Sequence, residues 1–159
     1  MDRPTVYIET SIISYLAARP SRDPVTARNQ RLTHEWWNTH RHRYELYASP
    51  EVVLEAGEGD QAQARQRLAF LAPLSLLSIT STARALADDL LRRVPLPLPH
   101  AKVDALHIAI AAEQKMAYLL TWDGKHIANP RLRPRIQKIC SSWGCQMPEL
   151  CTPATLLEE

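Results

Sequence analysis

Four acidic residues stand at points of the chain where a fold could bring their side chains to one site. Glu9 directly follows the β-branched and aromatic run 5–8, and Asp123 comes two residues after a second apolar run that ends at Thr121. Asp104 lies inside the most apolar helical segment, where a buried carboxylate is costly unless it is paired or binds a metal. Glu55 ends the helical segment that follows a third such run. The candidate catalytic and metal-binding residues are therefore Glu9, Glu55, Asp104 and Asp123.

Carboxylates that meet at one site favour the chemistry of a divalent cation. Their charges repel one another, and at least one of them would take up a proton near neutral pH. A cation removes this penalty, because hard oxygen ligands suit Mg²⁺ or Mn²⁺. The bound metal lowers the pKa of a water molecule and stabilises charge on a phosphate oxygen, and a pair of metals does both in an in-line attack. The four acids therefore predict metal-assisted hydrolysis of a phosphodiester.

Each acid also has an ordinary interpretation when it is taken alone. Glu9 and Asp104 have the type and place of acids that stabilise the first turn of a helix. Glu55 has the place of a solvated helix end, and Asp123 that of a turn residue. The prediction of a metal site therefore rests on the four positions together.

The elements that must position these acids alternate between strands and helices. Strands are expected at 5–8, 44–48, 74–79 and 118–121, with a short edge strand at 150–151. Helices are expected at 12–20, 25–41, 50–55, 61–71, 81–93, 102–115 and 129–143, with a final helical turn from 152. This alternation predicts a parallel sheet covered by helices on both faces. Such a sheet places its ligand site beyond the carboxyl ends of its strands, where Glu9 and Asp123 stand.

Length and composition limit the other classes of function. The 159 residues fit one domain, 1–159, and the net charge of +2 does not by itself indicate a nucleic-acid partner. Four glycines are too few to build a phosphate-binding loop, which excludes the commonest nucleotide-cofactor classes. Because the chain has no apolar leader and no run of 18 apolar residues, we expect a cytoplasmic protein with no membrane contact.

The three cysteines, Cys140, Cys145 and Cys151, are an odd number, which indicates reduced thiols. Buried structural thiols are favoured over a zinc site, because the chain has no CxxC pair and no histidine between or after these cysteines.

At the residues of the predicted site the chain resembles a known family. The segments Tyr-Ile-Glu-Thr-Ser at 7–11, Glu55, Val-Asp-Ala-Leu-His-Ile-Ala at 103–109 and Leu-Thr-Trp-Asp at 120–123 are similar, in this order, to those that define PIN domains. The resemblance runs from about Val6 to Leu156. It implies a PIN-like α/β fold, a three-layer α/β/α sandwich with a central parallel sheet of four to five strands. It also implies endonucleolytic cleavage of RNA with Mg²⁺ or Mn²⁺.

The resemblance also assigns roles to single positions. The four acids of the family fall on Glu9, Glu55, Asp104 and Asp123, and the first of them is usually aspartate, so Glu9 departs from the pattern by one methylene. The family places a small hydroxyl residue just after the first acid, for which Ser11 is favoured over Thr10, and Thr121 offers another hydroxyl.

Many PIN domains are VapC-like ribonuclease toxins of type II toxin–antitoxin pairs. The implied partners are therefore RNA, a small antitoxin protein and a second copy of the chain in a homodimer.

Four further residues are candidates for contact with RNA: His107, His126, Asn129 and Arg19. His107 lies three residues after Asp104 and so shares its helix face, with a packed histidine as the alternative. His126 and Asn129 follow Asp123. Arg19 is one of several arginines that could hold RNA phosphates, with a solvated surface position as the alternative.

Trp36 and Trp37 are adjacent and cannot share one helix face. We expect at least one to be partly exposed as a partner surface, and packing of both against the sheet is the alternative.

Two other functions are compatible with the same residues. A PIN scaffold without catalysis would bind RNA or a protein, and the glutamate at Glu9 keeps this alternative open. A phosphotransfer domain, such as a receiver or a haloacid-dehalogenase-like phosphatase, needs an aspartate nucleophile directly after the first strand, where Glu9 stands.

Overall fold

A computed structural model describes residues 2–123, 127 and 129–159 of the chain. Within these residues one parallel sheet has the strand order β3-β2-β1-β4-β5. Its strands are β1 (Thr5–Ile8), β2 (Glu45–Ala48), β3 (Ser75–Leu76), β4 (Tyr118–Leu120) and β5 (Glu149–Cys151). The central strand β1 is enclosed on both faces, and Val6, Tyr7 and Ile8 have no exposed surface.

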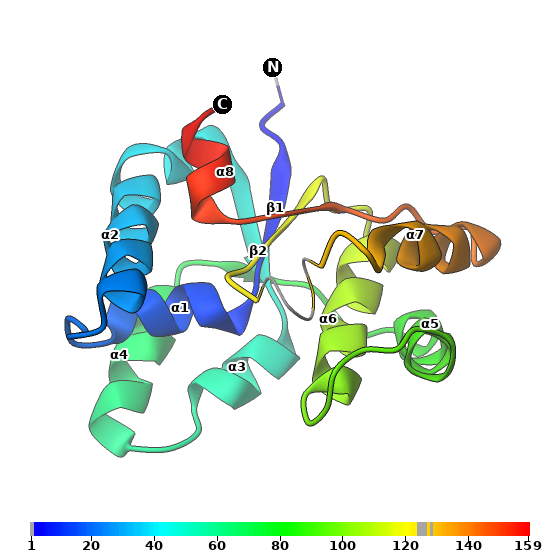
Figure 1. Ribbon diagram of the computed structural model, residues 1–159, viewed down its shortest axis with the longest axis horizontal. Helices are drawn as coiled ribbons and strands as arrows, with labels where there is room; N and C mark the ends of the chain where they lie inside the picture. Colours follow the sequence, from blue (N-terminus) through cyan, green and yellow to red (C-terminus); the bar gives the residue numbers. More distant parts are fainter. Residues whose placement is uncertain (1, 124–126, 128) are drawn as a thin grey trace.

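Helices cover both faces of this sheet (Figure 1). One layer contains α1 (Thr10–Ala17), α2 (Pro24–Thr39), α4 (Gln61–Leu71) and α8 (Pro153–Leu157), in which α1 contacts α2 and α4, and α2 contacts α8. The other contains α5 (Ser81–Arg93), α6 (Ala101–Glu113) and α7 (Arg133–Ser142), in which α5 contacts both α6 and α7. The remaining helices of the described residues are η1 (Arg41–Arg43) and α3 (Pro50–Ala56). The predicted three-layer α/β/α sandwich is therefore confirmed.

Side-chain caps explain where most of these helices begin. A carboxylate or hydroxyl oxygen just before the helix accepts a hydrogen bond from a backbone N–H of the first turn, which satisfies a group that has no partner inside the helix. The capping residues are Asp23, Ser49, Asp60, Thr80 and Thr152.

Three expected element bounds differ from the structure by three or more residues. The first helix ends at Ala17 and not near Pro20, because the backbone is already extended at Ala18, two residues before the proline. The third strand covers only Ser75–Leu76, because its partner β2 ends at Ala48, where Ser49 caps the next helix. The helix expected at 129–143 begins at Arg133.

The four residues before Arg133 form a turn. In it the Asn129 side chain accepts a hydrogen bond from the Arg131 backbone N–H over 3.0 Å, and the Leu132 N–H bonds to the Asn129 carbonyl over 3.1 Å. An asparagine side chain that binds a nearby backbone N–H gives that group an alternative to the hydrogen bonds of a helix. The helix therefore begins later than expected.

Both tryptophans of α2 are buried, so the expectation that one of them is partly exposed was wrong. Trp36 is fully buried against Tyr44, with ring centroids 5.8 Å apart, and Trp37 meets the edge of Phe70 at the same distance. The Arg41 guanidinium lies 5.0 Å from the centroid of the Trp37 ring and covers it. The alternative expectation, that both tryptophans are packed inside the protein, is confirmed.

Two cysteines are buried, and all three are free thiols. Burial raises the pKa of both Cys140 and Cys151 to about 12, which keeps these thiols protonated. No helix in the described part of the chain is long and apolar enough to cross a bilayer.

Candidate active site

The carboxyl ends of β1 and β4 meet at one rim of the sheet, because the two strands are parallel neighbours. The Glu9 N–H donates to the Leu120 carbonyl over 3.1 Å, so the first residue after β1 lies beside the end of β4. Glu9 is 7% exposed and occupies the N-cap of α1, but its carboxylate makes no capping hydrogen bond to that helix. The carboxylate of Glu9 therefore does not serve as the cap of α1.

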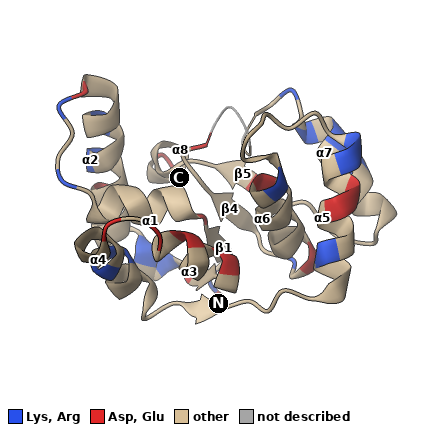
Figure 2. Ribbon diagram, turned by 90° about the horizontal axis from the view of Figure 1, so that it is seen from below, with Lys and Arg blue, Asp and Glu red and all other residues tan. Residues whose placement is uncertain are grey.

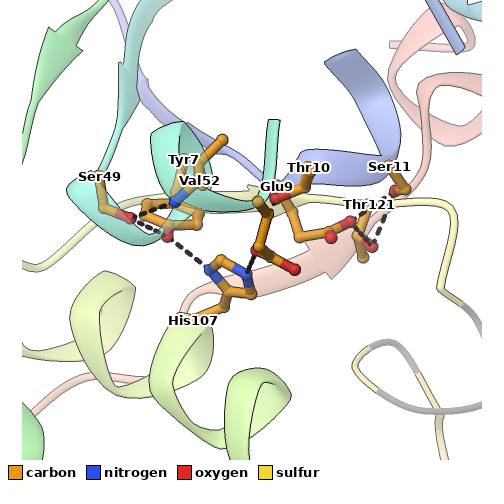
Figure 3. Close-up of polar contacts among 9 residues, drawn as sticks. Tyr7, Glu9, Thr10, Ser11, Ser49, Val52, His107 and Thr121 are labelled. Carbon is orange, nitrogen blue, oxygen red and sulfur yellow. Dashed lines mark hydrogen bonds and ion pairs between the residues drawn. The ribbon is translucent and has the colours of Figure 1, made fainter. Parts of the chain in front are cut away.

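Two hydroxyl groups hold the carboxylate of Glu9. Ser11 Oγ donates to Glu9 Oε1 over 2.5 Å, and Thr121 Oγ1 donates to the same oxygen over 2.6 Å (Figure 3). Their oxygens also accept hydrogen bonds from the loop after β4, because the Trp122 N–H donates to Ser11 Oγ and the Asp123 N–H to Thr121 Oγ1, each over 2.9 Å. The first acid and the loop that carries Asp123 are thus joined through two side chains.

Glu55 lies in the last turn of α3 and is held by two donors from other elements. Thr10 Oγ1 donates to Glu55 Oε1 over 2.7 Å, and His107 Nε2 lies 2.7 Å from the same oxygen. Burial raises the pKa of Glu55. The hydrogen bond and charge of His107 and the hydrogen bond of Thr10 together lower this pKa by more, so the net shift is downward. Glu55 is therefore ionised at neutral pH.

Asp104 approaches the same place from the first turn of α6, where it is 4% exposed. Burial lowers the pKa of His107, but its hydrogen bond to Glu55 and the negative charges of Glu9, Glu55 and Asp104 raise it above the ordinary value. The negative charges of three acids from separate elements therefore stabilise the protonated form of one imidazole. Acidic positions lie on both α3 and α6, whereas α7 carries basic ones (Figure 2).

The three hydroxyl candidates all contact an acid. Ser11 and Thr121 bind Glu9, and Thr10 binds Glu55. Asp123 lies half-buried in the loop after β4, tied at its N–H to Thr121. Among residues 2–123, 127 and 129–159, no three or more Asp, Glu, His and Cys side chains form a group compact enough to hold a metal ion.

The residues proposed to contact RNA are spread more widely. His107 has no exposed surface and binds Tyr7 and Glu55 through its two ring nitrogens. Arg19 is exposed after α1, and its backbone carbonyl accepts from the Gln30 side chain. Asn129 is half-buried, and His126 lies outside the described residues.

Sequence reasoning missed two residues that the fold adds to this site. The Tyr7 hydroxyl lies 2.8 Å from Ser49 Oγ and 2.7 Å from His107 Nδ1 (Figure 3). A tyrosine in a strand whose other residues are all β-branched was the available signal, because a buried phenol needs a hydrogen-bond partner. Ser49 was visible only as a helix cap, a role that it also has.

Comparisons with known proteins agree with this architecture. The model of the family described as PIN domain matches residues 6–131. Mycobacterium tuberculosis VapC20, described as a Sarcin-Ricin loop cleaving toxin, superposes with a TM-score of 0.61 at 16% identity over 79% of this chain and 95% of that chain.

A second structure, VapBC2 from Rickettsia felis bound to a DNA fragment from its promoter, superposes with a TM-score of 0.53 at 15% identity. It covers 93% of this chain and 98% of that chain. At these identities the likeness concerns the fold. The search of curated proteins found no significant match.

Proposed function

The chain belongs to the PIN domain family, and from that premise we propose that it is a metal-dependent endoribonuclease. Its metal ligands are Glu9, Glu55, Asp104 and Asp123. The observation that carries the proposal is how Glu9 and Glu55 are held. Each is bound by two donors at Oε1, and neither accepts a hydrogen bond at Oε2 from the described residues. One oxygen of each carboxylate is thus held by hydrogen bonds, and we propose that the other oxygen binds the cation.

The donor set suits Mg²⁺ or Mn²⁺ better than a softer metal. All four proposed ligands are carboxylates, and hard divalent cations prefer oxygen. His107, which lies beside Glu55, is turned inward and uses both ring nitrogens on protein partners. The cysteines belong to other elements, with Cys140 in α7 and Cys151 in β5.

The residues of the chain divide the chemical work in a simple way. A bound metal would polarise the scissile phosphate and lower the pKa of the attacking water. Ser11 and Thr121 would keep Glu9 in place, and Thr121 would also keep the backbone of Asp123 near it. Preorganised ligands of this kind need little rearrangement during the reaction.

RNA is the substrate class that the family and the solved relatives favour. One relative is described as a toxin that cleaves the Sarcin-Ricin loop and another as a VapBC2 complex, so we propose a toxin of a toxin–antitoxin pair. Its partners would be a small antitoxin and a second copy of the chain. Exposed Arg19 and half-buried Asn129 are the proposed phosphate contacts.

The test is cleavage of a structured RNA by the purified protein with Mn²⁺, with Mg²⁺ or with a chelator. We expect cleavage with either metal and none with the chelator. Asp104→Asn should abolish it while the circular dichroism spectrum stays unchanged. Asp88→Asn removes an exposed carboxylate of α5 and should cleave like the parent protein. RNA binding without cleavage under every condition would support the non-catalytic scaffold and overturn the nuclease.

A further inference from the structure

A buried chain of hydrogen bonds leads from the core to Glu55. Ser49 Oγ lies 2.8 Å from the Tyr7 hydroxyl, which lies 2.7 Å from His107 Nδ1, and His107 Nε2 lies 2.7 Å from Glu55 Oε1. Ser49, Tyr7 and His107 have no exposed surface. The chain links β1, the cap of α3 and α6 to the carboxylate of Glu55. Figure 3 shows its part from Ser49 through Tyr7 to His107.

The direction of the last bond follows from the groups themselves. An ionised carboxylate only accepts hydrogen bonds, so His107 Nε2 must carry a proton and donate a hydrogen bond to Glu55 Oε1. When the imidazole is neutral, Nδ1 accepts from the Tyr7 hydroxyl, and when it is cationic, Nδ1 donates to it. Burial raises the pKa of Tyr7 well above its ordinary value, so the phenol keeps its proton. The bond from Nε2 to Glu55 is the same in both states.

Glu55 needs such a support because its own helix restrains it weakly. It lies one residue before the end of α3, a helix of seven residues, and its neighbour Leu54 is 62% exposed. The ends of helices fray, and a carboxylate there has freedom that a metal ligand must lose. His107 belongs instead to α6, whose residues Ile108–Ala112 are fully buried.

We propose that His107 is a positioning residue that holds Glu55 through Nε2, and that Tyr7 and Ser49 orient its imidazole. This rests on the proposed function, in which Glu55 binds the metal. His107 therefore acts through Glu55 and contacts neither RNA nor the metal. Outer partners of this kind orient metal ligands, and their loss typically costs about 10- to 100-fold in metal affinity or activity.

The first experiment compares two substitutions at the same position. The side-chain amide nitrogen of His107→Gln occupies roughly the place of Nε2 and can still donate to Glu55, whereas His107→Leu cannot. We expect His107→Leu to weaken Mn²⁺ binding, measured by electron paramagnetic resonance, and to lower kcat for RNA cleavage, each by about 10- to 100-fold. His107→Gln should stay within about threefold of the parent protein, and KM should change little in either variant.

Two further variants separate positioning from a general loss of stability. Tyr7→Phe removes only the hydroxyl that orients the imidazole, and it should weaken Mn²⁺ binding less than His107→Leu does. It also supplies the test if His107→Leu does not fold. Asp89→Asn neutralises a buried carboxylate of α5 that accepts from Trp143 and pairs with Arg92 and Arg93, and it should lower the melting temperature without changing Mn²⁺ binding. Equal effects of the glutamine and leucine variants would overturn the proposal, as would normal Mn²⁺ binding by Tyr7→Phe.

A readout without metal distinguishes this proposal from the nuclease itself. In the metal-free protein, the side-chain ¹³C resonance of Glu55 should shift in His107→Leu and not in Asp89→Asn, and His107 Nε2 should carry a proton in the parent protein. If the parent protein neither binds Mn²⁺ nor cuts RNA but these signals behave as expected, the proposed function fails and the positioning of Glu55 stands. An unchanged Glu55 resonance in His107→Leu would overturn the positioning whatever the nuclease assay gives.

Discussion

Thr121 Oγ1 donates a 2.6 Å hydrogen bond to Glu9 Oε1, which joins two residues that lie 112 positions apart in the chain. The Thr121 oxygen also accepts the backbone N–H of Asp123 over 2.9 Å. One hydroxyl group therefore sets the place of the first acid relative to the last.

Thr121→Val should damage both stability and metal binding. The substitution keeps the shape of the side chain but leaves the Glu9 carboxylate and the Asp123 N–H each with one partner fewer, which costs roughly 1–3 kcal/mol of unfolding free energy. We expect the affinity for Mn²⁺ to fall by about tenfold. Urea denaturation and isothermal titration with Mn²⁺ measure the two effects.

Thr121→Ser is the matched control, since it keeps the hydroxyl group. It should bind Mn²⁺ like the parent protein. If the valine variant also binds like the parent protein, the hydroxyl has no part in placing Glu9.

Glu9→Asp should weaken metal binding, even though aspartate is the usual residue in the family that the chain resembles. The hydroxyl groups of Ser11 and Thr121 are placed 2.5 Å and 2.6 Å from the carboxylate of the longer side chain. Aspartate withdraws this carboxylate by one methylene and cannot keep both bonds without movement of α1. We expect a loss of Mn²⁺ affinity of roughly 10- to 100-fold, as for other disturbed ligand supports.

The comparison is made by electron paramagnetic resonance on the two proteins, with Glu9→Gln as the variant that keeps the length and loses the charge. Glu9→Gln should bind Mn²⁺ more weakly than Glu9→Asp, because charge matters more than reach. A Glu9→Asp variant that binds Mn²⁺ more tightly than the parent protein would show that these hydroxyls do not fit the longer acid.

The three thiols should differ in reactivity. The thiolate is the nucleophile in alkylation, so a thiol with a pKa of about 12 is almost entirely unreactive at pH 8, and its reaction rate rises with pH. Cys140 and Cys151 should therefore stay unmodified by iodoacetamide in the folded protein, while the half-buried Cys145 reacts first.

Mass spectrometry of the alkylated protein identifies the modified residue. In denaturant all three cysteines should react at similar rates, which provides the control. Rapid labelling of Cys140 or Cys151 in native buffer would contradict their burial.

Much of the fold follows from local patterns. The alternation of strand and helix signals predicted the parallel sheet and its two helical layers, and single caps such as Asp23 and Thr80 mark where helices begin. The errors in the expected bounds lie where the length of one element depends on another element. The strand expected at 74–79 is shortened because its length depends on the end of β2, which no local signal of 74–79 reports.

The sequence by itself determined which acids stand at strand ends and in the apolar helix, because burial preference and the direction of parallel strands are local consequences of residue type. Only the tertiary structure decided which groups hold those acids. The link from Tyr7 to His107 spans 100 residues and the link from Thr10 to Glu55 spans 45, and a hydrogen bond requires atoms about 3 Å apart. No pattern along the chain encodes such distances, since they arise from the packing of α3 and α6 around the end of β1.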